Sequence, residues 1–350
     1  MTVSLLYLPN EASPGDQVGP RLAFESMHRD GRLRDYSAYS YLVEAKRHGA
    51  AVALSRLKEL VAEWRPDLLL WQHVGKFPLR WADVESLRAA APRMHLLYHE
   101  GDVYGRWAKR IPEPVRILMA AADTVALVGR GSYAKLARSV GAKRVIYSPS
   151  AADTVRFGQP WNPTLEREFD VLLIGNRVKS LRPWGRMPGA SKRIELVRAL
   201  GRRFGERFAV FGNGWEGFRG NHGKVEYAIQ EGIQRRAWVT ASWNHFDQVE
   251  AYFSDRIPIS LMSGVPHVTN HQPGYESVFG PNPPLCWAKS VDELVARAED
   301  LLALGPAGIN EIGRQAQEYC NTRFTADVVY PRLIAEVMGI GQSSGLRNSA

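Results

Sequence analysis

The sequence predicts an α/β protein, built as two Rossmann-like doubly wound domains that face each other across a cleft. Three observations predict this fold. Apolar or β-branched runs alternate along the chain with loops and with segments of helical apolar period, which is the pattern of parallel βα units. The chain has 350 residues, more than one hydrophobic core usually serves. Residues 148–163 hold three prolines and no clear period, so they divide the βα series in two.

The first domain is expected over residues 1–150. Its first strand is the apolar run 3–8, which is followed by a loop rich in Pro, Gly and Asp and then by a helix over 21–29. Further strands are predicted at 67–73, 94–99, 124–128 and 144–147. Helices are predicted at 55–64, 81–91, 114–122 and 133–140. This alternation predicts one doubly wound domain.

A linker, residues 151–163, leads into the second domain, residues 164–325. Strands are predicted at 169–174, 208–211, 237–241 and 266–270, with a further apolar segment at 257–262. Helices are predicted at 192–204, 225–234, 248–253, 291–304 and 309–321. A last helix, 328–338, lies within a segment 326–340 that is expected to pack back on the first domain. The polar residues 341–350 are expected to form a disordered tail.

Composition narrows the class of protein. Hydrophobic residues make up 45% of the chain and charged residues 23%, which indicates an ordinary globular protein. No apolar run approaches the roughly 18 to 20 residues that cross a bilayer, and residues 1–10 lack the features of a signal peptide. Cys286 and Cys320 are too few for a disulfide framework, and no Cys/His spacing resembles a zinc site. We therefore expect a cytoplasmic protein, with peripheral contact at the inner face of a membrane as a further option.

The net charge of +9 points to an acidic partner, such as nucleotide phosphate, anionic lipid or nucleic acid. Much of this charge follows the predicted strand 169–174, where nine basic residues are countered only by Glu195. The basic residues are Arg177, Lys179, Arg182, Arg186, Lys192, Arg193, Arg198, Arg202 and Arg203. Any one of them is more often a solvated surface charge. The cluster as a whole indicates phosphate binding.

Residues 253–280 combine turn, strand and polar features that suit a nucleotide site. They hold a Ser263–Gly264 turn, Pro266 and an apolar strand, a polar elbow from Asn270 to Gln272, and Gly274 ahead of Glu276. Backbone N–H groups at such turns are preorganised for phosphate, and a nearby carboxylate can take the ribose hydroxyls. The same spacing fits a plain strand-turn-helix joint equally well.

Five motifs of the second half together resemble a known family. They are FDVLLIGN (169–176), FAVFGNGW (208–215), SDR followed by SGVPHV (263–268), GYESVF (274–279) and WAKSVDELV (287–295). These motifs resemble those of the GT-B glycosyltransferases, group 1, and within it the CgeB-like (spore-maturation-type) branch. In the first half only the βα order and the acidic turn HEGD (99–102) look similar. The resemblance implies a hexosyltransferase-like enzyme that moves a sugar from a nucleotide-diphosphate donor, bound by the C-terminal domain, to an acceptor hydroxyl.

The resemblance also implies which residues bind the donor. Gly212 and Gly214 would line the base and diphosphate pocket, and Arg256 would lie near the donor. Ser263 with Gly264 would approach the phosphates, while Glu276 would meet the ribose or the sugar. The other candidates for donor binding are Asn176, Arg177, Lys179, Trp215, His271, Gly274 and Tyr275, with Trp215 as a stacking partner for the base or sugar.

The resemblance implies that basic side chains and backbone N–H groups, rather than a metal, stabilise the leaving diphosphate. We therefore expect no metal and no cofactor, since the nucleotide sugar is a substrate. Retaining members typically carry two glutamates eight residues apart, and here Ala251 and Ile259 occupy those positions. Retention and inversion both stay open, with Glu250 or Glu276 as candidate substitutes.

If transfer inverts, a base must deprotonate the acceptor hydroxyl. The candidates lie in the first domain at strand ends that should face the cleft. The HEGD turn is the leading one, which makes His99, Glu100 and Asp102 the catalytic candidates. His73, and Glu11 with Asp16, are further options, although each is more often a structural or solvated group.

Three other functions fit the same sequence. A nucleotide-sugar 2-epimerase can share the two-domain fold and act on the donor alone. A transferase that modifies DNA bases would suit the basic charge, but the charge is concentrated near the predicted donor loop and no recognition motif is present, so we do not expect a nucleic-acid partner. A non-catalytic remnant is suggested by the missing glutamate pair. For a transferase, the acceptor would be a glycan, a lipid-linked saccharide or a small molecule.

Overall fold

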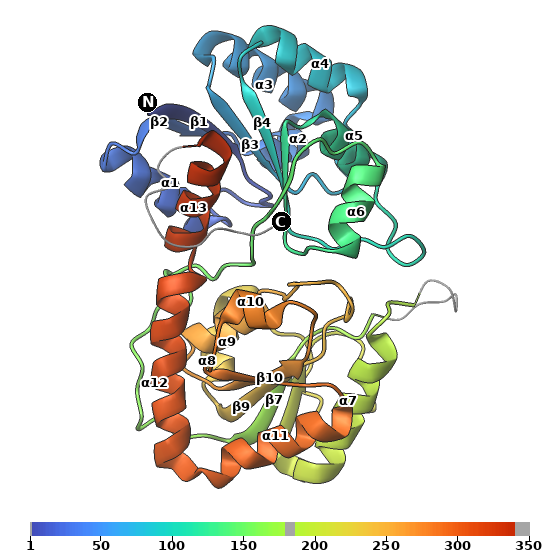
Figure 1. Cartoon of the computed structure of the whole chain (residues 1–350), viewed down its shortest axis with the longest axis vertical. Helices are drawn as coiled ribbons and strands as arrows, with labels where there is room; N and C mark the ends of the chain where they lie inside the picture. Colours follow the sequence, from blue (N-terminus) through green and yellow to red (C-terminus); the bar gives the residue numbers. More distant parts are fainter. Residues whose placement is uncertain (1, 179–185, 340–350) are drawn as a thin grey trace.

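The computed structural model describes residues 2–178 and 186–339. It contains two parallel sheets, one in each half of the chain, and each sheet is covered by helices (Figure 1). The predicted class of two Rossmann-like α/β domains is therefore confirmed. Lys179 and the predicted tail 341–350 lie outside the described residues.

The N-terminal sheet has the order β2-β1-β3-β4-β5-β6, with every pair parallel. Its strands are β1 (Val3–Leu8), β2 (Leu33–Ala38), β3 (Leu68–Gln72), β4 (His95–Glu100), β5 (Thr124–Leu127) and β6 (Val145–Tyr147). Its helices are α1 (Val18–Arg29), α2 (Tyr41–His48), α3 (Ala50–Trp64), α4 (Trp81–Ala90), α5 (Glu113–Ala121) and α6 (Ser132–Ser139). Successive strand residues enter opposite cores, as Leu5 and Leu6 do, because both faces of the sheet are buried.

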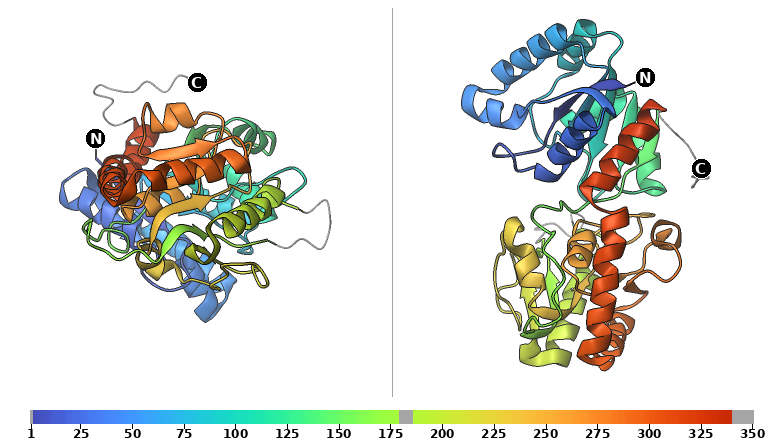
Figure 2. Two further views of the ribbon diagram at one scale, coloured as in Figure 1. Left: turned by 90° about the horizontal axis from the view of Figure 1, so that it is seen from below. Right: turned by 90° about the vertical axis from the view of Figure 1, so that its left-hand side faces the viewer.

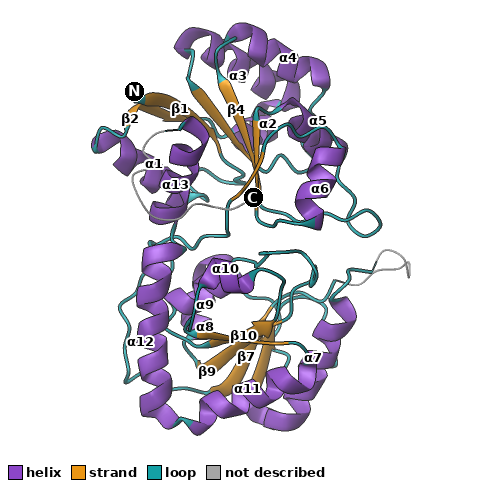
Figure 3. Ribbon diagram, viewed as in Figure 1, coloured by secondary structure: helices purple, strands orange, loops and turns teal. Residues whose placement is uncertain are grey.

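The C-terminal sheet has the order β11-β10-β9-β7-β8, also with parallel pairs. Its strands are β7 (Phe169–Ile174), β8 (Phe208–Phe211), β9 (Ala237–Ser242), β10 (His267–Asn270) and β11 (Leu285–Ala288). The helices of this half are α7 (Ala190–Phe204), α8 (Gln230–Gln234), α9 (Arg256–Met262), α10 (Tyr275–Phe279), α11 (Val291–Ala303) and α12 (Gly305–Arg323). Figure 3 shows these helices packed around the strands.

Each sheet has one point where its strand order reverses. In the N-terminal sheet the chain runs from β1 outward to β2 and then returns to β3 on the other side of β1. In the C-terminal sheet it runs from β7 to β8 and then returns to β9 on the other side of β7. Loops diverge at such a switch point and leave a crevice beyond the strand ends, where α/β proteins bind ligands.

The chain crosses between the domains twice, and the two crossings are hydrogen-bonded to each other. The Ala152 N–H donates to the Phe324 carbonyl at 2.9 Å, and the Ala326 N–H donates to the Ala152 carbonyl at 2.9 Å. After the second crossing, α13 (Ala326–Met338) packs against α1 of the first domain, as the right-hand view of Figure 2 shows. Tyr330 and Leu333 of α13 are buried in the N-terminal core, so the C-terminal segment is part of that domain's packing.

Several predicted elements differ from the structure. Strands β2 and β11 and helices α2 and α10 were not predicted. Residues 248–253 form turns where a helix was expected, so that prediction is wrong. Residues 227–234 form a short 3₁₀ turn and α8 rather than one helix over 225–234. The apolar segment 257–262 lies in α9, where Pro258 occupies the first turn that tolerates proline.

Among the described residues, no helix combines the length and the apolar character needed to cross a bilayer.

Candidate active site

A cleft of about 900 Å³ lies between the two domains at the carboxyl ends of both sheets. From the N-terminal domain it is lined by the loop after β1 and the loop after β4. From the C-terminal domain it is lined by the residues that follow β9 and by the start of α9, and the interdomain linker and α13 close one side. Both switch points therefore open into one shared space.

The C-terminal wall of the cleft carries two guanidinium groups, those of Arg193 and Arg256. A side chain at Gly175, just after β7, would place its Cβ 3.3 Å from Arg256 Nε and 3.7 Å from Arg193 Nη1. The two guanidinium groups thus pack against a buried backbone position where glycine leaves room for them. This position is the β7/β9 switch point.

Arg193 is 3% exposed and bonds only neutral acceptors among the described residues. Its Nε donates to the Trp243 carbonyl at 2.8 Å, and its Nη1 donates to the Asn176 carbonyl at 3.1 Å. Arg256 Nη1 donates to Ser254 Oγ at 2.7 Å, and no ion pair joins either arginine to a described carboxylate. Burial, and then the charge of Arg256, lower the pKa of Arg193 well below its ordinary value. A buried cation without a counter-charge is costly, so this wall favours an anion.

His245 lies beside Arg193 and stays neutral. Its Nδ1 is 3.4 Å from Arg193 Nη1. Burial, followed by the charges of Arg193, Arg256 and Lys109, lowers its pKa to about 3. A neutral imidazole beside two guanidinium groups adds a polar contact without adding charge.

The N-terminal wall carries a carboxylate, that of Asp102, whose side chain is 47% exposed and lines the cleft. Its Oδ2 lies 2.8 Å from Lys109 Nζ and 4.0 Å from His73 Nε2. The loop that carries it is held by Tyr133, whose hydroxyl donates to the Asp102 carbonyl at 2.5 Å. Asp102 is thus placed on the wall opposite the two arginines.

Glu100 is fully buried and supports this wall from behind. Its Oε1 accepts from His73 Nδ1 at 2.5 Å and from the Asp102 N–H at 2.8 Å, and its Oε2 accepts from the Tyr98 hydroxyl. Burial alone would lower the pKa of His73, but the hydrogen bond and charge of Glu100 raise it above its ordinary value. The structure therefore corrects the expectation that Glu100 is a catalytic group: its carboxylate is enclosed and positions Asp102 and His73.

His99 lines the cleft and is 6% exposed, and neither ring nitrogen has a hydrogen-bond partner among the described residues. Burial, and then His73, lower its pKa to about 4. At neutral pH it is a neutral imidazole with free donor and acceptor capacity, which suits a ligand hydroxyl better than proton abstraction.

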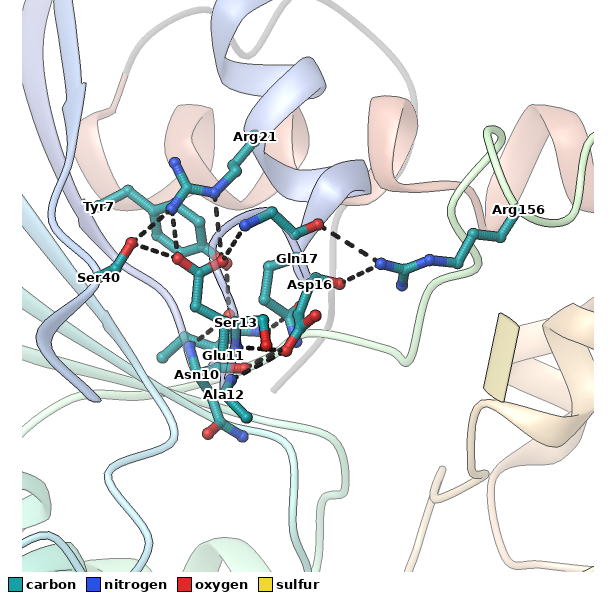
Figure 4. A network of polar contacts seen from close by, with 12 residues as sticks. Tyr7, Asn10, Glu11, Ala12, Ser13, Asp16, Gln17, Arg21, Ser40 and Arg156 are labelled. Atoms are coloured by element: carbon teal, nitrogen blue, oxygen red, sulfur yellow. Dashed lines mark hydrogen bonds and ion pairs between the residues drawn. The ribbon is translucent and has the colours of Figure 1, made fainter. Parts of the chain in front are cut away.

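The loop after β1 is fixed by the network shown in Figure 4. Glu11 is buried, pairs with Arg21 at 2.5 Å and accepts from the Ser40 hydroxyl. Asp16 Oδ2 accepts from the N–H groups of residues 12 and 13, and Arg156 of the linker donates to the Asp16 carbonyl at 2.6 Å. Glu11 therefore cannot serve as a base, and the network holds the N-terminal lip of the cleft to the linker.

Most of the predicted donor-binding residues lie outside the cleft lining. Gly212 and Gly214 form a turn packed on the β7 loop, since added Cβ atoms would lie 2.5 Å from the Gly175 carbonyl and 2.6 Å from the Arg177 carbonyl. Asn176 Oδ1 accepts from the N–H of residue 213 at 2.9 Å, so it too braces that turn. Contact of Gly212, Gly214 and Asn176 with a ligand stays a prediction. In the structure these residues pack the turn after β8 against the loop after β7.

Trp215 is fully buried in the C-terminal core, and its indole N–H donates to the Gly175 carbonyl at 2.6 Å. Both ring faces are covered, which corrects the expectation that it stacks on a base or sugar. Arg177 lies over the Phe218 ring, 5.0 Å from its centroid, and reaches the Gly214 carbonyl.

Ser263 and Gly264 correct another expectation. They connect the end of α9 to the start of β10, and in a parallel sheet that edge is opposite the cleft. Ser263 Oγ donates to the Ile259 carbonyl at 2.7 Å, and Gly264 packs against Trp161 and Gly313. Neither residue can meet a phosphate bound in the cleft.

The GYESVF motif (274–279) follows β10 at the edge of the sheet that faces the cleft, but its residues do not line the cleft. His271 pairs with Glu276 at 2.9 Å, and the Glu276 side chain is 65% exposed. Gly274 packs on Glu250, and the buried Tyr275 hydroxyl donates to the Tyr252 carbonyl at 3.1 Å. Among the predicted donor-binding residues that the structure describes, Arg256 alone lines the cleft.

Sequence reasoning missed Arg193 and His245 as site residues. Arg193 belongs to the predicted basic cluster, but nothing local separates it from its eight neighbours. Its burial depends on α7 lying against the end of β9.

One group among the described residues could hold a metal ion, namely His73, Glu100 and Asp102, whose ligand atoms lie within 4.8 Å of one another. Its oxygens are already engaged by Tyr98, Lys109 and a backbone N–H. The donor set fits an internal hydrogen-bond network better than a metal.

Comparison with known proteins agrees with this architecture. A family model described as glycosyl transferase-like matches residues 192–335, which run from α7 into α13. A glycosyltransferase of Rickettsia africae ESF-5 superimposes with a TM-score of 0.59 at 12% identity, covering 98% of this chain and 100% of that one. Anabaena Alr3699/HepE in complex with UDP-glucose superimposes with a TM-score of 0.57 at 13% identity, and the match covers 96% of this chain and 99% of that one. Sucrose-phosphate synthase of Thermosynechococcus elongatus superimposes with a TM-score of 0.56 at 12% identity, and the match covers 97% of this chain and 100% of that one. No curated protein matches. The shared fold is GT-B.

Proposed function

We propose that the protein transfers a sugar from a nucleotide-diphosphate donor to an acceptor hydroxyl in the interdomain cleft. The observation that carries the proposal is the pair of guanidinium groups of Arg193 and Arg256 in the cleft wall beside Gly175, neither of which forms an ion pair with a described carboxylate. The glycosyl transferase-like match over residues 192–335 supports it. So does the same fold in Alr3699/HepE, which was solved with UDP-glucose. The CgeB-like branch remains a prediction.

The chemistry needs positive charge where the diphosphate leaves. As the bond between the anomeric carbon and the diphosphate oxygen breaks, negative charge grows on that oxygen. Two guanidinium groups already held in the cleft wall stabilise it without reorganising, which is the basis for proposing transfer without a metal.

The opposite wall suits the acceptor. Asp102 presents an ionisable oxygen to the cleft, and its loop is fixed by Glu100 and Tyr133. We propose that Asp102 accepts the proton or the hydrogen bond of the acceptor hydroxyl, while the neutral His99 bonds a sugar hydroxyl. The N-terminal domain is then the acceptor domain.

Donor binding tests the proposal. A thermal-shift screen of nucleoside diphosphates and their sugars should give at least one clear hit, since a ligand at a hundred times its Kd adds roughly 2.7 kcal/mol of stability. Calorimetry with that nucleotide should show roughly tenfold or greater loss of affinity in Arg256→Ala. Arg202→Ala, an exposed position on α7, is the matched control and should bind normally. Equal affinity of Arg256→Ala and wild type would remove this wall from donor binding.

A further inference from the structure

We propose that the N-terminal domain docks on anionic lipid through a surface beside the cleft, which we call the Trp107 surface. It consists of Trp107 and Trp81 with the basic side chains of Lys76, Arg80, Arg106 and Arg110. The proposal concerns where the protein sits and does not depend on the donor chemistry.

The topology places these residues on two loops at one edge of the N-terminal sheet. The loop that follows β3 carries Lys76 and Arg80 and leads into Trp81 at the start of α4. The loop that follows β4 carries Arg106, Trp107 and Arg110 and leads into α5. Since β3 and β4 are hydrogen-bonded neighbours, both loops leave the same edge of the sheet side by side. Residues of α4 and α5 share one depression of about 450 Å³, lined by Trp81 and Arg116 among others.

The two tryptophans are unusual in being open to solvent. Trp107 is 78% exposed and Trp81 is 47% exposed, whereas the other tryptophans of the described residues are buried or half-buried. Indole rings are amphipathic and accumulate at the level of lipid head groups.

The charge of the surface selects the kind of lipid. Arg80 and Arg116 are paired with Asp83 and Glu113 three residues away. Lys76, Arg106 and Arg110 have no ion-pair partner within the described ranges, so the surface keeps an excess of positive charge. Trp81 has an acidic neighbour, since its indole N–H donates to Glu85 Oε1 at 2.7 Å. The unpaired Arg106 and Arg110 belong to the loop of Trp107, and cations beside an exposed indole ring complement an anionic bilayer, which attracts each lysine or arginine near its surface.

The surface also has a fixed relation to the cleft. The loop that carries Trp107 begins at Gly101 and includes Asp102 and Lys109, which line the cleft. Docking through this loop would hold the cleft mouth at the lipid surface.

Vesicle co-sedimentation tests the proposal. Wild-type protein should bind vesicles of phosphatidylcholine mixed with phosphatidylglycerol and should not bind vesicles of phosphatidylcholine alone. Trp107→Ala should weaken binding roughly tenfold, and the double variant Arg106→Glu/Arg110→Glu should weaken it by roughly tenfold or more. The positions are exposed, so the variants should melt like wild type, which is checked in parallel.

Matched controls lie in the C-terminal half. Leu304→Ala removes an exposed apolar side chain, 53% exposed, and Arg202→Glu/Arg323→Glu makes the same change of charge. Both should bind like wild type. Quenching by bromine-labelled lipid should be smaller in Trp107→Phe than in wild type. The proposal would be overturned if the wild-type protein did not bind the anionic vesicles, or if Trp107→Ala bound them as well as wild type. It would also be overturned if the control variants lost as much vesicle binding as the variants of the Trp107 surface.

Discussion

Asp102 places its carboxylate on the cleft wall, while Glu100, two residues earlier, keeps its own buried. Replacing Asp102 by Asn keeps the shape and removes the proton-accepting charge. We predict that Asp102→Asn lowers sugar transfer roughly tenfold or more with unchanged affinity for the nucleotide. Asp292→Asn, exposed on α11, is the control. Unchanged turnover in a folded Asp102→Asn variant would remove this residue from the mechanism.

His73, which bonds to Glu100 in the same wall, makes the stability of the folded protein depend on pH. Its pKa is raised in the folded protein by Glu100 against the opposing effect of burial, so the folded state binds the proton more tightly than the unfolded state. The stabilisation is complete below the ordinary pKa of histidine, roughly 6.5, and is lost as pH rises through the folded value. His73→Asn, which tolerates the positive φ of 31° at this position, should therefore be more destabilising at acid than at alkaline pH. Denaturant unfolding at several pH values measures this, and a pH-independent difference would contradict it.

At the scale of elements, the Gly264 turn lies at the edge of the sheet away from the cleft. An added Cβ would lie 2.6 Å from Trp161 Cδ1, and φ is +67°. Gly264→Ala should cost about 1–3 kcal/mol of unfolding free energy and leave nucleotide affinity unchanged. Gly280→Ala, with φ +70° but open space around it, separates backbone strain from the steric clash and should cost less. Loss of nucleotide affinity in folded Gly264→Ala would instead support a phosphate role for the turn.

The elements that could be predicted are those whose local pattern already matches their environment. β7 is apolar apart from Asp170, and β8 is wholly apolar, because the sheet is buried on both faces; the predicted bounds of both strands agree with the structure. β2 has the sequence LRDYSA and only Leu33 of it is buried, so it shows no apolar run. In the site, Asp102 and Arg256 could be selected from motifs. Arg193 could not, since its role depends on a contact with Trp243, 50 residues away.

The Ser263–Gly264 prediction failed for a topological reason. A small-residue turn before an apolar strand looks the same at either edge of a parallel sheet. Only the observation that α9 precedes it, with β10 running toward the cleft, places the turn at the far edge.

At the scale of the whole molecule, α13 makes the C-terminal segment part of the N-terminal core. Leu333 is 3% exposed there, and Tyr330 packs on Phe24 with ring centroids 5.4 Å apart. Leu333→Ala should cost about 2–5 kcal/mol of unfolding free energy, whereas the exposed Leu304→Ala should stay within about 0.5 kcal/mol. Chemical denaturation compares them, and equal stabilities would show that α13 does not support the first domain.

The two domains meet around one space, with Arg193 and Arg256 on the C-terminal wall and Asp102, paired with Lys109, on the N-terminal wall. The most direct test of this arrangement is a crystal structure of the protein with the nucleoside diphosphate that stabilises it most. The diphosphate oxygens should lie within hydrogen-bond distance of both guanidinium groups, beside Gly175. A diphosphate bound at the Gly212–Gly214 turn or elsewhere, without contact to Arg256, would contradict the account.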